Sequence, residues 1–195
     1  MFTSLLLASA AFNAPAMMRA PASSGVSMMA KSKAIPFLEE PEGLSGWAGD
    51  KGFDPLAFGT TNMKWMREAE LKHGRLAMLA TVGWLAVDFG LRFPGAEYSA
   101  VPSALAAHNF GVYKGDMVIL LMAASALEIV SFFATMQMLN GETERKPGEF
   151  KFDPLNFGKD PSMELKEIQN GRLAMIAFSG IVTQAALTSK GFPYF

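Results

Sequence analysis

Two short blocks of the chain repeat a set of polar side chains that can act as metal ligands and charge partners. The segment Glu70–Arg75 (ELKHGR) recurs as Glu167–Arg172 (EIQNGR). Each block places a carboxylate first, a second donor three residues later and an arginine five residues later. Carboxylate and amide oxygens and the histidine nitrogen are Lewis bases, and magnesium accepts oxygen ligands. The pattern therefore indicates two equivalent metal-ligand positions.

The two donors of each block share one face if the blocks are helical. Residues three apart differ by about 60° around a helix and about 4.5 Å along it, which brings His73 beside Glu70 and Asn170 beside Glu167. Gln184 follows on the same side of an apolar run, where a buried amide needs a partner and a metal would supply one. A packing clamp or a merely hydrogen-bonded histidine are the plainer interpretations, and the recurrence of the set favours ligands.

The arginines need partners, because an unpaired charge next to an apolar helix core costs several kcal/mol. Residues five apart lie about 140° around a helix and do not pair within it. Glycines inside both blocks permit two helices to approach closely. If the helices cross there, the expected ion pairs are Glu70 with Arg172 and Glu167 with Arg75.

Three apolar segments are expected to form these elements, over residues 63–91, 117–139 and 162–189. The middle one is long enough to span a bilayer core of about 30 Å. Since one helix separates the two repeats, the first and third must run in the same direction. We therefore expect an all-α membrane protein with three transmembrane helices, the first and third crossed and related by a pseudo-twofold axis along the membrane normal.

Three further ionisable residues lie in or near the spans. Glu128 interrupts the middle span with no Lys or Arg within one turn, so either it is neutral or a cation compensates it, and we favour magnesium ligation. Asp88, near the end of the first span, is more typical of an interfacial charge. His108 precedes the second span in an expected loop, where a solvent-facing role is at least as consistent as ligation.

A second repeat precedes the first and third spans. The segment Phe53–Gly59 (FDPLAFG) recurs as Phe152–Gly158 (FDPLNFG). Proline fixes a turn, and an aspartate side chain accepts hydrogen bonds from the backbone that follows it. The blocks therefore predict paired turns before the helices, and Asp54 and Asp153 are also candidates for ligand contact.

Composition excludes several classes of function. The chain has 195 residues, half of them hydrophobic, with a formal net charge of −1 and no basic stripe that would indicate nucleic-acid binding. Without cysteine it has no thiolate nucleophile and no Cys-based metal site. Nothing in the sequence indicates catalysis, and we expect no enzyme.

The N-terminal segment differs from the rest of the chain. No Asp or Glu precedes Glu39, and a short apolar core is followed by an Ala-, Ser-, Met- and Pro-rich basic stretch. This composition predicts a bipartite signal-plus-transit presequence over residues 1–30, followed by a three-helix domain over 31–195. Lys and Arg concentrate from Lys31 to Lys72, the approach to the first span and its start, and between the second and third spans. This places those segments on the same, positive side of the membrane.

The repeated Glu-x-x-His/Asn-Gly-Arg and Phe-Asp-Pro-Leu segments resemble the chlorophyll-binding light-harvesting complex family from about Gly43 onward. Green-lineage members have an arginine where this chain has Ser131 and a glutamine where it has Leu120, which leaves the charge partner of Glu128 open. The resemblance implies carotenoid ends near Asp54 and Asp153, ion pairs through Arg75 and Arg172, and magnesium ligands at Glu70, His73, Glu128, Glu167, Asn170 and Gln184.

The presequence junction, the short loops and the C-terminal segment Gly191–Phe195 resemble red-lineage chlorophyll a/c antennae of the fucoxanthin or peridinin type. This resemblance implies chlorophyll a, chlorophyll c and fucoxanthin-, peridinin- or diadinoxanthin-like carotenoids. It places the chain in the plastid thylakoid membrane among its lipids, N-terminus stromal and C-terminus lumenal, in an oligomer or supercomplex with other antenna subunits and a photosystem I or II core. The implied function is light harvesting. The alternatives are a photoprotective, energy-dissipating relative and a small membrane transporter that uses the Glu and Arg groups as a relay.

Overall fold

The structure, a computed structural model, describes residues 30–41, 43–154 and 156–194, so that nearly all of the expected presequence lies outside the described residues. The described part of the chain contains helices and no strand, which confirms the all-α class. Its elements are η1 (Phe58–Thr60), α1 (Met63–Asp88), α2 (Ala96–Ser99), α3 (Ala104–Lys114), α4 (Asp116–Leu139), η2 (Phe157–Lys159) and α5 (Pro161–Thr188).

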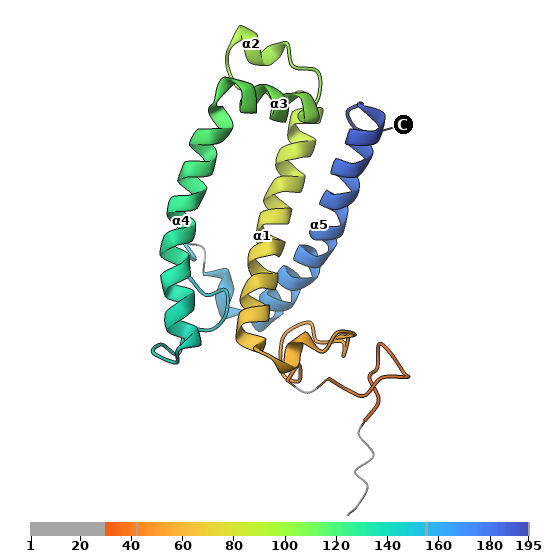
Figure 1. Cartoon of the computed structure of the whole chain (residues 1–195), viewed down its shortest axis with the longest axis vertical. Helices are drawn as coiled ribbons and strands as arrows, with labels where there is room; N and C mark the ends of the chain where they lie inside the picture. The colour runs from red at the N-terminus through yellow and green to blue at the C-terminus, as the bar shows by residue number, and fades with distance from the viewer. Residues whose placement is uncertain (1–29, 42, 155, 195) are drawn as a thin grey trace, which may run out of the picture.

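Three long helices form the body of the molecule. Helices α1 and α5 lie side by side and run in the same direction, and α4 returns in the opposite direction beside α1 (Figure 1). Helix α1 ends three residues before the expected end of the first segment, because the chain turns at Gly90, which has a positive φ of 99°. The parallel course of the first and third helices is as the repeat predicts.

Side chains outside the helices fix where α1 and α5 begin. The Asn62 side chain accepts a hydrogen bond from the Trp65 amide at 3.2 Å, and the Asp160 side chain accepts one from the Ser162 amide at 2.9 Å. Pro161 occupies the first turn of α5, where its missing N–H costs nothing. Both helices of the repeat are therefore capped immediately after their Phe-Asp-Pro blocks.

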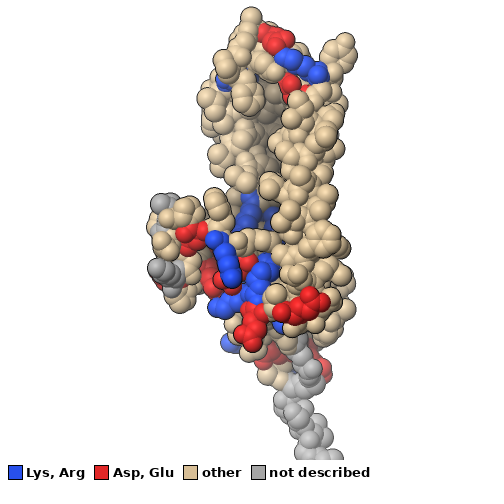
Figure 2. Space-filling view, turned by 90° about the vertical axis from the view of Figure 1, so that its left-hand side faces the viewer, with Lys and Arg blue, Asp and Glu red and all other residues tan. Residues whose placement is uncertain are grey.

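The surface divides into charged ends and an uncharged band. Figure 2 shows Lys, Arg, Asp and Glu gathered over the lower part and at the upper tip of the molecule, with other residues between them. Helices α4 and α5 are long and apolar enough to cross a membrane, and most side chains of α4 point outward. Helix α1 is more charged, because all its ionisable residues except Asp88 lie in its N-terminal half, which ends at Arg75.

The expected loop between the first two spans contains helices α2 and α3. Two side-chain caps start α3: the Ser103 hydroxyl accepts from the Ala106 amide at 3.3 Å, and Asp88 accepts from the Ala104 amide at 2.7 Å. The interpretation of this segment as a loop was wrong. The sequence argument could not find the start of α3, because one of the side chains that cap it, Asp88, belongs to the end of α1. His108 therefore lies on a helix, with an exposed side chain.

Candidate functional site

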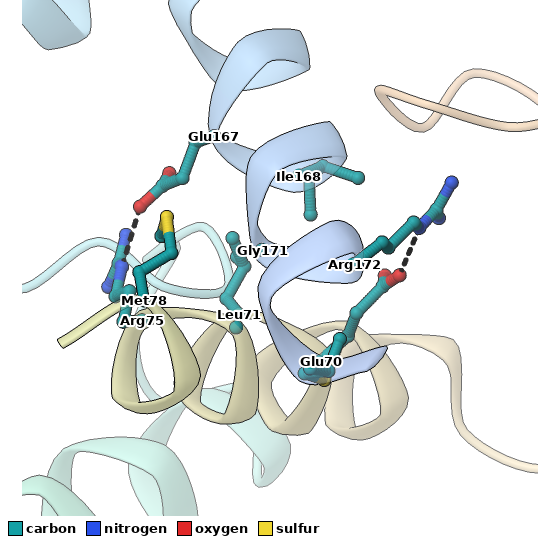
Figure 3. A pocket seen from close by; sticks show the side chains of 10 residues that line it. Glu70, Leu71, Arg75, Met78, Glu167, Ile168, Gly171 and Arg172 are labelled. Carbon is teal, nitrogen blue, oxygen red and sulfur yellow. Dashed lines mark hydrogen bonds and ion pairs between the residues drawn. The ribbon is translucent and has the colours of Figure 1, made fainter. Parts of the chain in front are cut away.

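The backbones of α1 and α5 meet at the glycines of the two repeats. A Cβ atom added to Gly74 would lie 3.1 Å from the Cα of Gly171, and the reverse distance is also 3.1 Å. The two distances are equal, as expected if a twofold axis relates the two helices. Figure 3 shows this crossing with the polar side chains on its two sides.

Both ion pairs that the residue spacing predicts are present at the crossing. Arg75 Nε lies 2.7 Å from Glu167 Oε1, and Arg172 Nε lies 2.7 Å from Glu70 Oε1 (Figure 3). The four side chains are between 26% and 40% exposed, so part of each pair faces outward from the helices. Each carboxylate is compensated by the opposite helix and stays accessible.

Each arginine of the two ion pairs also donates a hydrogen bond to the carbonyl of a glycine in a loop. Arg172 Nη1 donates to the Gly49 carbonyl and Arg75 Nη1 donates to the Gly148 carbonyl, both at 2.7 Å. These glycines have φ values of 75° and 80°, a conformation that residues with a Cβ rarely adopt. Both stand four residues before a Phe-Asp-Pro block. The repeat therefore extends back to these glycines, a signal that the sequence reasoning missed.

The two aspartates of the Phe-Asp-Pro-Leu blocks make the same local contacts. Asp54 accepts from the amides of Phe58 and Gly59 at 3.0 and 2.7 Å. Asp153 accepts from the amides of Phe157 and Gly158 at 3.2 and 2.8 Å. Each carboxylate thus closes the turn that begins η1 or η2, which supports the turn interpretation. Their contact with carotenoids stays a prediction.

His73 and Asn170 are oriented alike. His73 Nδ1 lies 2.8 Å from the Ala69 carbonyl, and Asn170 Nδ2 donates to the Lys166 carbonyl at 2.8 Å. In both cases the carbonyl belongs to the residue four positions earlier, so the N–H side of the group is occupied. No group in the described part of the chain bonds to the lone pairs of His73 Nε2 and Asn170 Oδ1, and both side chains are exposed.

Glu70 differs from Glu167 in having a second cation. Arg67 Nη1 lies 2.7 Å from Glu70 Oε2, and Arg67 also donates to the Ala48 carbonyl. The Arg67 side chain is buried. In the second repeat Glu164 occupies the corresponding position, so Glu167 has no such neighbour on its own helix. Sequence reasoning did not identify Arg67.

The charge of Glu128 is compensated by a neighbouring helix. Lys72 Nζ of α1 lies 2.8 Å from Glu128 Oε2 and donates to Ser131 Oγ at 2.7 Å. The neutral alternative for this carboxyl is therefore wrong, and the cation that compensates it is a lysine. The sequence argument missed Lys72 because it considered only cations within one turn of Glu128 on the same helix, and Lys72 lies on α1.

A buried carboxylate joins α1 to the loop after α4. Glu68 accepts from the Gly148 amide at 2.5 Å, and Arg145 Nη2 lies 3.3 Å away. Glu68 is only 1% exposed. Thr135 Oγ1 of α4 lies 3.5 Å from the other carboxylate oxygen. The cluster fixes the loop whose carbonyl receives Arg75, and no repeated motif predicted it.

The remaining candidates lie apart from the crossing. The Gln184 side chain is exposed on the outer surface of α5, and its role as a ligand stays a prediction. Asp88 accepts from the Ala104 and Phe192 amides and from the Tyr194 hydroxyl, at 2.7, 3.2 and 2.8 Å. Burial, with this hydrogen bond from Tyr194 to Asp88, raises the pKa of Tyr194 to about 12. Asp88 thus joins α1 to α3 and to the C-terminal segment.

These features define a class of protein: crossed parallel helices, apolar outer surfaces, and paired donors that face outward with one lone pair free. A planar ligand whose central magnesium accepts a single axial donor fits such positions, since each is accessible from outside the bundle. The comparison with known families points to the same class. The family model of the chlorophyll A-B binding proteins matches residues 40–186.

Plant relatives support this assignment. Chlorophyll a-b binding protein 6 of Arabidopsis thaliana is 36% identical over 170 residues, which cover 80% of this chain and 70% of the relative. Photosystem I chlorophyll a/b-binding protein 5 of the same plant is 36% identical over 182 residues, covering 80% and 71%. The chain belongs to the chlorophyll a-b binding protein family, which confirms the light-harvesting, chlorophyll-binding class predicted from the motifs. These relatives are named for chlorophyll binding and not for a catalysed reaction, which fits the expectation that the chain is not an enzyme.

Proposed function

We propose that this chain is a three-span thylakoid antenna that holds chlorophylls and carotenoids and passes their excitation energy to a photosystem. The observation that carries the proposal is the equivalence of His73 and Asn170. Both have their N–H groups bound to the preceding helical turn and their lone pairs directed away from it. Such a hydrogen bond fixes the ring or amide orientation of a metal ligand and supports its basicity.

The chain would hold chlorophyll magnesium through six side chains. Chlorophyll supplies the light-absorbing macrocycle when bound, and the residues set its position and keep water away. The carboxylates need their cations for this role, because a charged ligand in an apolar setting is stable only when paired. The proposed ligands are Glu70, His73, Glu128, Glu167, Asn170 and Gln184.

Helix α1 is proposed as the third membrane span. It has 26 residues and would be about 39 Å long, which exceeds the hydrocarbon thickness. Its charged half meets α5 at the crossing, where Glu70 and Arg75 each form an ion pair with the opposite helix. The charged ends seen in Figure 2 would then lie at the two membrane surfaces.

Orientation and partners follow from the same arrangement. Helices α1 and α5 begin at the end of the molecule that carries most Lys and Arg, which favours a stromal N-terminus and a lumenal C-terminus. A relative named for photosystem I supports association with a photosystem core and other antenna subunits. Protease protection in isolated thylakoids, and co-migration with either photosystem on native gels, test these two points.

The pigments are proposed to be of the red-lineage type: chlorophyll a, chlorophyll c and fucoxanthin-, peridinin- or diadinoxanthin-like carotenoids. The support is the resemblance of the presequence, the short loops and the C-terminal segment. Extraction of the native protein followed by chromatography tests this directly. Chlorophyll b in place of chlorophyll c would contradict the proposal.

Replacement of ligands tests pigment binding. In protein reconstituted with pigments, His73→Leu and Asn170→Leu should each lose one chlorophyll per protein, because no other described donor takes that position. Gln169→Leu, next to Asn170 on a different face of α5, is the matched control and should lose none. Unchanged stoichiometry in both ligand variants would refute the assignment. The fluorescence lifetime of the loaded protein then distinguishes harvesting from dissipation.

A further inference from the structure

The Lys72 side chain of α1 makes polar contacts with the middle of α4. Its ammonium lies 2.8 Å from Glu128 Oε2 and 2.7 Å from Ser131 Oγ. The Ser131 hydroxyl itself lies 3.1 Å from the same carboxylate oxygen. Two donors, one from α1 and one from α4, therefore meet at one oxygen atom of Glu128.

The contacts leave the other oxygen of Glu128 available. Among the described residues, none makes a hydrogen bond or ion pair with Glu128 Oε1. The side chain of Glu128 is 66% exposed, whereas that of Lys72 is 27% exposed. The pair thus presents a carboxylate with one oxygen neutralised from inside and one facing outward. This is the form in which a carboxylate can bind a metal in an apolar setting.

The lysine is held from a third side by the loop after α4. Its Nζ lies 5.8 Å from the centre of the Phe150 ring, and the Arg145 guanidinium lies 4.7 Å from the same ring. An aromatic face attracts a cation at such distances. The position of Lys72 therefore depends on α1, α4 and this loop together.

We propose that Lys72 is the positioning cation of a magnesium-ligand site at Glu128. It neutralises and orients the carboxylate from α1, so that loading of a chlorophyll on α4 depends on the packing of the two helices. The inference rests on the proposed function and adds a residue to it. The need for a cation also distinguishes the Glu128 site from the Asn170 site, because the Asn170 amide is a neutral ligand.

The test uses the full chain reconstituted with pigments. Lys72→Met should lose one chlorophyll per protein, since the uncompensated carboxylate no longer binds magnesium in an apolar setting. Adding Glu128→Gln to that variant should recover the lost chlorophyll, because an amide oxygen ligates without a cation. Gln169→Met, at the corresponding position of α5, is the matched control and should keep full loading. Far-UV circular dichroism of the same samples reports helix content.

Three results would overturn the inference: full chlorophyll loading in Lys72→Met, no recovery in the double variant, or no loss of chlorophyll in Glu128→Leu. The second outcome would make Lys72 a structural contact only. If Lys72→Met loses helix content as well, recovery of loading in the double variant still supports the positioning role. A wild-type chain that binds no chlorophyll would instead overturn the proposed function. A wild-type chain that binds chlorophyll but loses none in Glu128→Leu would overturn this inference and the assignment of Glu128 as a ligand, while the antenna function would stand.

Discussion

The two copies of the repeat agree where α1 and α5 face each other and differ where they face other parts of the molecule. At the crossing, Gly74, Glu70 and Arg75 of α1 have counterparts in α5 that make the same contacts between the two helices. On the outer side, the buried carboxylate Glu68 and the cation Lys72 of α1 correspond to Leu165 and Gln169 of α5, both exposed. The comparison teaches that symmetry is kept only where both copies have the same neighbour. Helix α4 packs on α1 and requires polar partners there.

The largest expected effect is at the buried carboxylate that only the first repeat has. Glu68→Ala removes the carboxylate from Arg145, whose side chain is only 11% exposed, and the acceptor from the buried Gly148 amide. The change should cost about 3–5 kcal/mol of unfolding free energy. Leu165→Ala, at the corresponding position of α5, should cost about 0.5 kcal/mol because that side chain is 39% exposed. Denaturant titration in detergent micelles, followed by circular dichroism, measures both. Equal losses of unfolding free energy in the two variants would show that the outer faces of α1 and α5 do not differ in this respect.

The second test concerns the symmetric crossing itself. Gly74→Ala and Gly171→Ala each place a methyl group 3.1 Å from the opposite backbone. Each should lower the unfolding free energy by about 1–3 kcal/mol, and by similar amounts. The same titration measures this.

The chain provides matched controls for these glycines. A Cβ added to Gly83 or Gly180, which also correspond between the repeats, meets nothing within 4 Å. Alanine at either should raise stability by about 0.5–1 kcal/mol through helix propensity. A large difference between Gly74→Ala and Gly171→Ala would contradict a symmetric crossing.

A third, smaller effect is expected in the turns of the Phe-Asp-Pro blocks. Ala57 and Asn156 both adopt left-handed backbone conformations, with φ of 55° and 57°. Asparagine tolerates this conformation better than alanine does. Ala57→Asn should therefore stabilise the protein by about 1 kcal/mol and Asn156→Ala should destabilise it by a similar amount, measured by the same titration. Effects of the same sign would show that the two turns are not equivalent.

The smallest effect expected is in the pH dependence of the helix starts. Asp160 caps α5, and hydrogen bonds from the Ser162 amide and hydroxyl hold its pKa below the ordinary value of 3.8. A lowered pKa means that the cap contributes fully above about pH 3.8 and is lost as the pH falls through the lowered value. Helix α1 is capped by Asn62, which does not titrate.

Amide hydrogen exchange, corrected for the intrinsic pH dependence of the reaction, measures this difference. The first turn of α5 should lose protection in acid while that of α1 keeps it. Asp160→Asn should remove the pH dependence of α5. Equal loss in both helices would mean that the caps do not control their first turns.

The crossing could be predicted from sequence because its information is local and repeated. The separation of five residues between Glu70 and Arg75 excludes pairing within one helix, and the second copy supplies the alternative partners. The donors His73 and Asn170 were identified for the same reason. Their orientation was not, since it depends on the hydrogen bond that each makes with the preceding turn.

The sequence by itself determined the three long helices, the parallel course of the first and third, and the reciprocal ion pairs, because helix periodicity fixes which side chains share a face. Only the tertiary structure decided the partners of residues without a repeat. Lys72 and Glu128 are separated by 56 positions, and Glu68 and Gly148 by 80. Neither pair can be found until α4 and its following loop are placed against α1, because burial and charge compensation depend on which helix faces happen to meet.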